Sequence, residues 1–191
     1  RRQKGNFKVK NIILVSLFFF FLQATSYSSN KENIIEKLIQ TNNLSFDFIQ
    51  TIDGKDEKGE CVIKYPKKIF CEYEKRKNKI LVSNGRNLVI KNKNQYYRYP
   101  IKNTPFEFLL DKNFLINKIN STELGEVEDK YLFFQIIENS NNINIFFNKK
   151  NYELIGWQVE DIYQNLVVTY IFNTSINSDV SEKLFVLPKI D

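Results

Sequence analysis

Residues 60–73 have the sequence ECVIKYPKKIFCEY, in which apolar and polar residues alternate on both sides of a proline. This period of two predicts two half-buried strands, and Pro66 predicts the turn of a hairpin. With the turn centred on Pro66, the numbers of paired residues sum to about 132, so Cys61 faces Cys71. One face of the hairpin is then apolar and consists of Cys61, Ile63, Tyr65, Ile69, Cys71 and Tyr73. The other face carries Glu60, Lys64 and Glu72, together with Val62 and Phe70.

The two cysteines of the chain are the pair that this register brings together. Directly opposed cysteines can form a cross-strand disulfide in an oxidising compartment, at a closely spaced pair without hydrogen bonds. Two small buried thiols are the alternative, because a shift of one residue would separate them. Redox catalysis is not expected, since the spacing is far from C-x-x-C.

The strand pattern continues on both sides of the hairpin. The predicted strands cover residues 44–52, 60–65, 69–74, 80–83, 88–91, 95–99, 131–137, 143–147, 152–159, 166–172 and 184–187. Turn signals separate many of them, with Asp53-Gly54, Asn84-Gly85 and residues 148–151 as the clearest. The sequence therefore predicts a mainly β fold with an antiparallel sheet of about eleven strands.

Two segments have helical patterns instead. Ser29 and Glu32 form a capping box before a helix that runs to about residue 42. Its apolar side contains Ile34, Ile35, Leu38 and Ile39. Residues 104–107 (Thr-Pro-Phe-Glu) predict an N-cap, a first-turn proline and a capping glutamate, and another helical turn is expected within residues 114–119.

The amino-terminal segment has the pattern of a secretory signal peptide. Five basic residues within the first ten precede an apolar run from Ile12 to Leu22, which is too short for the roughly 20 residues of a membrane span. Small residues at Ala24 and Ser26 predict cleavage before Tyr27. We therefore expect residues 1–26 to be removed, residues 27–191 to form a single domain, and the mature protein to be periplasmic.

The composition makes several function classes improbable. The chain has no histidine, which removes the commonest general base and the commonest zinc ligand, so neither catalysis nor a metal or other cofactor is expected. Paired carboxylates could come only from residues such as Asp47, Glu60, Glu72 and Asp161, which fall on polar faces or in turns. The net charge of +6 drops to +1 without the first ten residues, which argues against nucleic-acid binding.

An ordered set of short motifs resembles one protein family. The motifs are Phe46–Gln50 (F-x-x-x-Q), Lys64-Tyr65-Pro66, Val82–Gly85 (V-S-N-G), Asn103–Phe106 (N-T-P-F), Gly156-Trp157 before Asp161, and Leu184-Phe185 before Pro188. Together they resemble the LolA family of periplasmic outer-membrane lipoprotein carriers. The resemblance implies an unclosed, half antiparallel β-barrel with a helical lid over an apolar cavity.

The resemblance also implies a function without catalysis. Family members bind triacylated lipoproteins released by an ATP-driven inner-membrane transporter and pass them to an outer-membrane acceptor lipoprotein, and we expect a monomer. The cavity residues are expected to be Phe46, Phe48, Ile63, Tyr65, Ile69, Cys71, Tyr73 and Leu81. The lid residues are expected to be Ile35, Leu38, Ile39, Phe106, Phe108, Leu109 and Leu110. A lipid- or peptide-binding sensor of the same fold, without shuttling, is the alternative.

One position departs from the family pattern. Tyr65 stands where relatives commonly have an arginine that hydrogen-bonds the backbone of the lid. A phenol offers one donor in place of a forked guanidinium, so we expect a weaker closed state or closure mainly by apolar contact. Arg98 is a candidate substitute, although a solvated strand charge is the simpler interpretation.

Overall fold

The structure, a computed structural model, describes residues 29–74, 79–93, 95–139, 141–161 and 164–189. Within these residues eleven strands form one antiparallel sheet, in the order β6-β5-β4-β3-β2-β1-β11-β10-β9-β8-β7. The strands are β1 (Asn43–Ile52), β2 (Lys55–Lys64), β3 (Lys68–Tyr73), β4 (Ile80–Asn84), β5 (Asn87–Lys91), β6 (Tyr96–Pro100), β7 (Gly125–Val127), β8 (Tyr131–Glu138), β9 (Asn141–Asn148), β10 (Leu154–Glu160) and β11 (Leu166–Ile176). Because β6 and β7 are separate edges, the barrel is not closed, as predicted.

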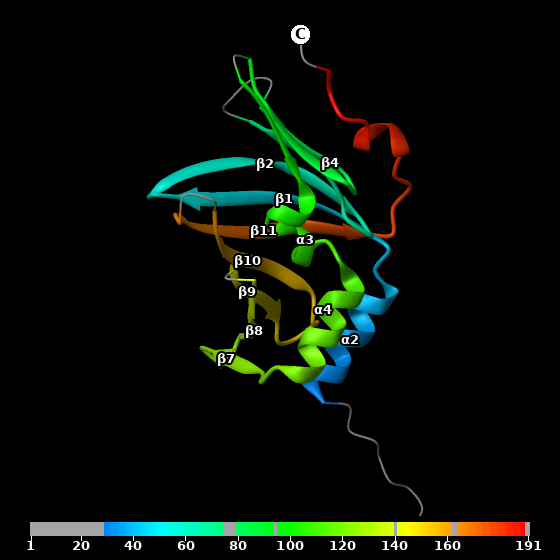
Figure 1. The fold of residues 1–191 in the computed structure, drawn as a ribbon. Coiled ribbons are helices and arrows are strands. Elements are labelled where there is room, and N and C mark those ends of the chain that lie inside the picture. Colours follow the sequence, from blue (N-terminus) through cyan, green and yellow to red (C-terminus); the bar gives the residue numbers. More distant parts are fainter. Residues whose placement is uncertain (1–28, 75–78, 94, 140, 162–163, 190–191) are drawn as a thin grey trace, which may run out of the picture.

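The sheet curves around three helices (Figure 1). These are α2 (Asn30–Gln40), α3 (Phe106–Leu109) and α4 (Lys112–Ser121), with the 3₁₀ turn η1 (Ile101–Asn103) just before α3. Alternate residues of the strands point inward, as a half-buried sheet requires, and form one core with the helices. None of the helices in the described ranges is long and apolar enough to cross a membrane. The predicted signal peptide, residues 1–26, lies outside the described residues.

Two strand assignments differ in kind from the sequence prediction, and a third strand, β2, begins at Lys55 instead of residue 60. Residues 184–187 do not form a strand, because Glu182–Phe185 is the 3₁₀ turn η2. The buried side chain of Phe185 packs beside β3 and β4 and satisfies the apolar pattern without a strand. The sequence also misses β7, which is only three residues long, and the ring of Phe133 lies over its Gly125.

The predicted turns are present where glycine was expected. Asp53 and Gly54 both have positive φ angles, 49° and 70°, between β1 and β2. Gly85 has a φ of 92° between β4 and β5. These are conformations that glycine, and to a lesser degree aspartate, adopts at low cost.

The helix signals are correct in position but not always in detail. The capping box of Ser29 and Glu32 is formed at the start of α2. Thr104, in contrast, does not cap α3, because its hydroxyl donates to the carbonyl of Ile101 in η1 (2.8 Å). Glu107 pairs with a residue outside the helix instead, as described below.

The convex face of the sheet has its own cover. Residues 177–189, here called the C-terminal strap, run past β3 and β4 after β11 ends (Figure 1). Glu182 of the strap pairs with Lys64 and Lys68, and the hydroxyl of Tyr96 donates to the carbonyl of Pro188 (3.2 Å). The concave face is therefore the side that is covered by helices.

Candidate functional site

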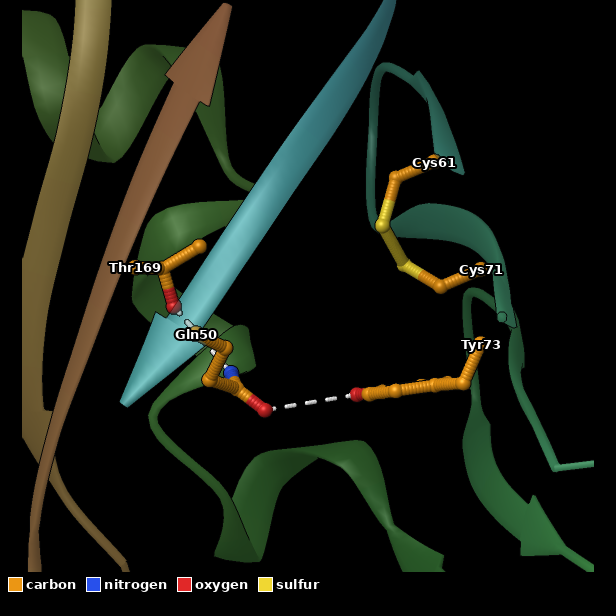
Figure 2. Close-up of a disulfide and its surroundings, with 5 residues drawn as sticks. All are labelled: Gln50, Cys61, Cys71, Tyr73 and Thr169. Carbon is orange, nitrogen blue, oxygen red and sulfur yellow. Dashed lines mark hydrogen bonds between the residues drawn. A yellow bond between two sulfur atoms is a disulfide. The ribbon is translucent and has the colours of Figure 1, made fainter. Parts of the chain in front are cut away.

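The β2–β3 hairpin has the register that was predicted from Pro66. Cys61 pairs with Cys71 and Ile63 pairs with Ile69. Cys61 and Cys71 are joined by a disulfide that lies on the inner side of the strands (Figure 2). Of the two alternatives left open by the sequence, the structure therefore has the disulfide rather than free thiols.

The residues predicted to line the cavity lie on the inner face of the first half of the sheet. Seven of the eight are buried, namely Phe46, Phe48, Ile63, Ile69, Cys71, Tyr73 and Leu81. The eighth, Tyr65, is half-buried and packs against the core. Burial raises the pKa of its hydroxyl to about 12, so the side chain is neutral at physiological pH.

The second half of the sheet contributes aromatic residues that the sequence analysis did not assign. Trp157, the only tryptophan of the chain, packs edge-on against Phe46, with ring centroids 6.1 Å apart. Phe147 and Phe134 are fully buried on β9 and β8 and pack edge-on as well. Their alternation along these strands was visible in the sequence, and the cavity lining could have been extended to them.

A short polar chain crosses the inner face near the disulfide (Figure 2). The hydroxyl of Tyr73 donates to Oε1 of Gln50 (3.4 Å), and Nε2 of Gln50 donates to Oγ1 of Thr169 (3.1 Å). Burial, with the nearby Glu57 carboxylate, raises the pKa of Tyr73 above its ordinary value. Gln50 thus links β3 to β11 across β1 with its polar groups satisfied.

Two helices of the lid hold each other by reciprocal lysines. Nζ of Lys31, in the first turn of α2, donates to the carbonyl of Thr122 just after α4 (2.7 Å). Nζ of Lys112, the first residue of α4, donates to the carbonyls of Ile39 and Thr41 at the end of α2 (both 3.0 Å). Ammonium groups at helix carboxyl ends also complement the helix dipoles. We call this arrangement the α2–α4 clamp.

The lid residues predicted from the sequence differ in how they face the sheet. Leu38, Phe108, Leu109 and Leu110 are buried, while Ile35 and Phe106 are partly buried against the core. Ile39 is 57% exposed, so its assignment to the cavity side of the lid is wrong. Ile34 and Leu38 define the buried direction of α2, and Ile39 lies about 140° from Ile34 at 100° per residue.

Lys67 connects the hairpin turn to α3 and the two residues after it by three polar contacts, which we call the latch. Its backbone N–H donates to the carbonyl of Leu110 (2.8 Å). Its ammonium lies 2.7 Å from Oε1 of Glu107 and 3.4 Å from Oδ2 of Asp111. The hydrogen bond to Glu107 is the main reason why the pKa of Lys67 lies above its ordinary value.

The turn itself orients Lys67 for these contacts. Lys67 has a φ of 63°, and its carbonyl accepts a hydrogen bond from the buried hydroxyl of Ser83 (2.7 Å). No hydrogen bond joins the hydroxyl of Tyr65 to the lid within the described residues, and Arg98 is exposed on the edge strand β6. Beside the apolar contacts that were expected, Lys67 supplies polar contacts to the lid from the other side of Pro66.

The space under the lid consists of two small adjoining pockets. Each has an empty volume of roughly 400 Å³ including its open side, and both are lined by Leu38, Tyr65, Phe147 and Leu154. The enclosed cavity volumes are only about 30 Å³ and 10 Å³, far below the roughly 300–1,000 Å³ of small-ligand sites. Room for several acyl chains therefore requires the lid to move away from the sheet.

The carboxylates considered for catalysis lie away from these pockets. Asp47 faces Glu60, which faces Glu72, in a row on the convex face. Asp161 accepts hydrogen bonds from the backbone N–H and the side chain of Asn165. Within the described ranges, no group of acidic or cysteine residues is arranged to hold a metal ion.

Comparison with known proteins gives one family. The family profile of the outer membrane lipoprotein carrier protein LolA matches residues 39–188. A comparison with curated proteins finds no match.

Solved structures of similar shape share little sequence with this chain. A LolA superfamily protein from Nitrosomonas europaea has 10% identity and a TM-score of 0.44, over 84% of this chain and 99% of that protein. A conserved protein from Thermus thermophilus has 8% identity and a TM-score of 0.49, over 83% and 93%. A domain assigned to outer membrane lipoprotein sorting from Vibrio parahaemolyticus has 7% identity and a TM-score of 0.45, over 80% and 94%.

Proposed function

The chain belongs to the LolA family of outer membrane lipoprotein carrier proteins, and on this premise we propose that it is a periplasmic chaperone for lipoproteins. It takes the acyl chains of lipoproteins released from the inner membrane into its cavity and carries them to the outer membrane. The observation that carries this proposal is the pair of apolar pockets inside a half-barrel, closed by a latched helical lid.

The physical need for such a protein is clear. Each acyl CH₂ group left in water costs about 0.8 kcal/mol, so one long chain costs on the order of 10 kcal/mol. Burial against Phe46, Phe147 and Trp157 would recover much of this free energy. The observed affinity then equals the gain from chain burial minus the cost of opening the lid.

The cellular location and the partners follow from the same premise. Export by residues 1–26 would place the chain in the periplasm, where a Cys61–Cys71 disulfide forms and persists. Its partners would be triacylated lipoproteins, an ATP-driven transporter in the inner membrane and an acceptor lipoprotein at the outer membrane. A monomer is the simplest form for a shuttle.

The proposal is tested by native mass spectrometry of the exported full-length product after co-expression with a triacylated lipoprotein. We expect a one-to-one complex that passes its lipoprotein to outer-membrane vesicles. Leu109→Glu, which puts a charge on the buried side of α3, should abolish the complex, while Lys102→Glu at an exposed position of η1 should not. A protein that stays empty in this experiment would overturn the proposal.

The same experiment distinguishes the carrier from a lipid sensor of the same fold. A carrier releases bound lipoprotein to vesicles that contain the acceptor, whereas a sensor holds its ligand. Retention of the lipoprotein after mixing with acceptor vesicles would exclude shuttling and leave a binding module.

A further inference from the structure

One of the two pockets opens to solvent at the edge of α2. It lies between the second half of α2, the start of β10 and the end of β11. Its lining consists of Lys37, Leu38, Thr41, Leu44, Tyr65, Phe147, Tyr152, Glu153, Leu154, Thr174 and Ile176. Ile176 is 38% exposed, whereas Leu38 and Phe147 deeper inside are buried. The opening therefore leads from water to the apolar space under the lid.

The rim of this opening carries an ion pair. Nζ of Lys37 lies 3.3 Å from Oε1 of Glu153, and the two side chains are 31% and 35% exposed. The hydroxyl of Tyr152, beside them, donates to Oδ1 of Asn30 (3.1 Å). The rim thus offers both a donor and an acceptor at no net charge, while the interior is lined mainly by apolar side chains, with the hydroxyl of Tyr65 among them.

A lipid whose chains fill the interior has to place its polar head at such a boundary, because burying ester and amide groups without partners is costly. The second pocket is lined mainly by apolar residues, among them Ile63, Leu110 and Trp157. The two pockets share four lining residues, so the space beside Glu153 adjoins the space beside Trp157, and chains that enter at Glu153 would reach Trp157 once the lid moves.

We propose that this opening is the head-group site of the cavity, and that Glu153 makes it selective for the uncharged diacylglyceryl head of a lipoprotein over anionic phospholipid. The inference rests on the proposed function. Ester carbonyls accept from Lys37, and the amide N–H of an acylated cysteine donates to Glu153. The charge of Lys37 is already balanced by Glu153 at 3.3 Å, so a phosphate would have to share this ammonium with the carboxylate and would leave the site with a net negative charge.

The head-group site and the latch involve different elements. The ion pair of the rim joins α2 to the residue before β10, whereas Lys67 joins the β2–β3 turn to α3. A change at the rim therefore leaves the Lys67 contacts to α3 in place. This separation allows the two to be tested independently.

The selectivity is tested by competition between an uncharged tripalmitoyl-cysteinyl peptide and phosphatidylglycerol, with native mass spectrometry as the readout. In Glu153→Gln the preference for the lipopeptide should fall about tenfold. Glu138→Gln is the matched control, because Glu138 pairs with Lys118 of α4 at 2.6 Å with similar exposure. An equal preference in the two variants would overturn the proposal and leave the carrier function intact.

The position of the head group is tested by photocrosslinking with a lipopeptide that carries a photoreactive group on its first serine. Crosslinks are expected at residues 37–41 and 152–154. Crosslinks confined to residues 106–111 would place the head at the latch and overturn the assignment. Failure of the wild-type protein to bind the lipopeptide at all would instead count against the proposed function.

Discussion

The lid consists of two parts that are held in different ways. In the α2–α4 clamp, Lys31 and Lys112 tie two helices of ten or more residues to each other. These helices are also joined to the sheet by the pairs Lys37–Glu153 and Lys118–Glu138. Within the described residues, the polar contact of the four-residue helix α3 to the sheet is, in contrast, the one made by Lys67. Helices tied to one another move together, whereas a short segment tied to a strand turn is released when that tie breaks. We therefore expect opening to start at α3.

The largest effect on stability is expected when a buried side chain is truncated in each part of the lid. Ile34→Ala in α2 should lower the free energy of unfolding by about 2–5 kcal/mol, as for other buried aliphatic residues. Leu110, directly after α3, is equally buried. Leu110→Ala should lower the free energy of unfolding by less, because this decrease cannot exceed the free-energy difference between the closed and the open lid. Urea unfolding measures both values. Equal losses would contradict an independently opening α3.

Removal of the latch should be the next effect in size. Lys67→Ala deletes the contacts to Glu107 and Asp111 and keeps the backbone hydrogen bond to Leu110. For partly exposed charges we expect about 1 kcal/mol, which speeds amide exchange at residues 106–110 roughly fivefold. Quenching of Trp157 fluorescence should rise in parallel. Lys102→Ala serves as the control at an exposed site.

Removal of Lys112 from the α2–α4 clamp should loosen the end of α2 and leave α3 in place. Lys112→Ala leaves the carbonyls of Ile39 and Thr41 without their ammonium donor, so the last turn of α2 should fray. Hydrogen exchange should quicken at residues 38–42 by a factor of about three. An equal increase at residues 106–110 would show that the two parts of the lid move as one body.

The dependence of lid opening on pH should distinguish the latch from the other contacts of the lid. Because the pKa of folded Lys67 lies above the ordinary 10.5, its stabilising contribution is complete below pH 10.5 and is lost as the pH rises through the folded value. Trp157 quenching should therefore increase above that pH. Lys67→Arg, which stays charged, should reduce the increase. The same profile in both proteins would remove Lys67 from the mechanism.

The smallest effect is expected at Tyr65. Its hydroxyl makes no hydrogen bond to the lid within the described residues, so Tyr65→Phe should leave exchange at residues 106–110 unchanged. A lid that opens faster in this variant would mean that the phenol replaces the family arginine directly. The Lys67 contacts would then be secondary.

Much of the fold was predictable because local signals agree with the final packing. Pro66 fixed the register that joins Cys61 to Cys71, and the period of two located the inner face of β1 to β4. The strand predicted near Phe185 failed for a physical reason, since an isolated apolar residue can be buried by a 3₁₀ turn against a sheet. Periodicity alone does not distinguish the two.

The site was less predictable because its polar contacts join residues far apart in the sequence. Lys67 and Glu107 are forty residues apart, and Lys67 is one of many lysines. Its position directly after the hairpin proline, opposite an acidic residue of the predicted lid helix, was the available signal. Lys37 and Glu153 come together only when α2 docks at the start of β10, which no local pattern indicates.

The separate edges β6 and β7 have a mechanical consequence. A closed barrel has a circumference fixed by its number of strands and its shear, so it cannot widen without breaking a ladder of hydrogen bonds. In this sheet no ladder of hydrogen bonds joins β6 to β7. A small change of twist between neighbouring strands can therefore move these two edge strands apart while every ladder stays intact. The width of its interior can therefore change by elastic bending of the sheet.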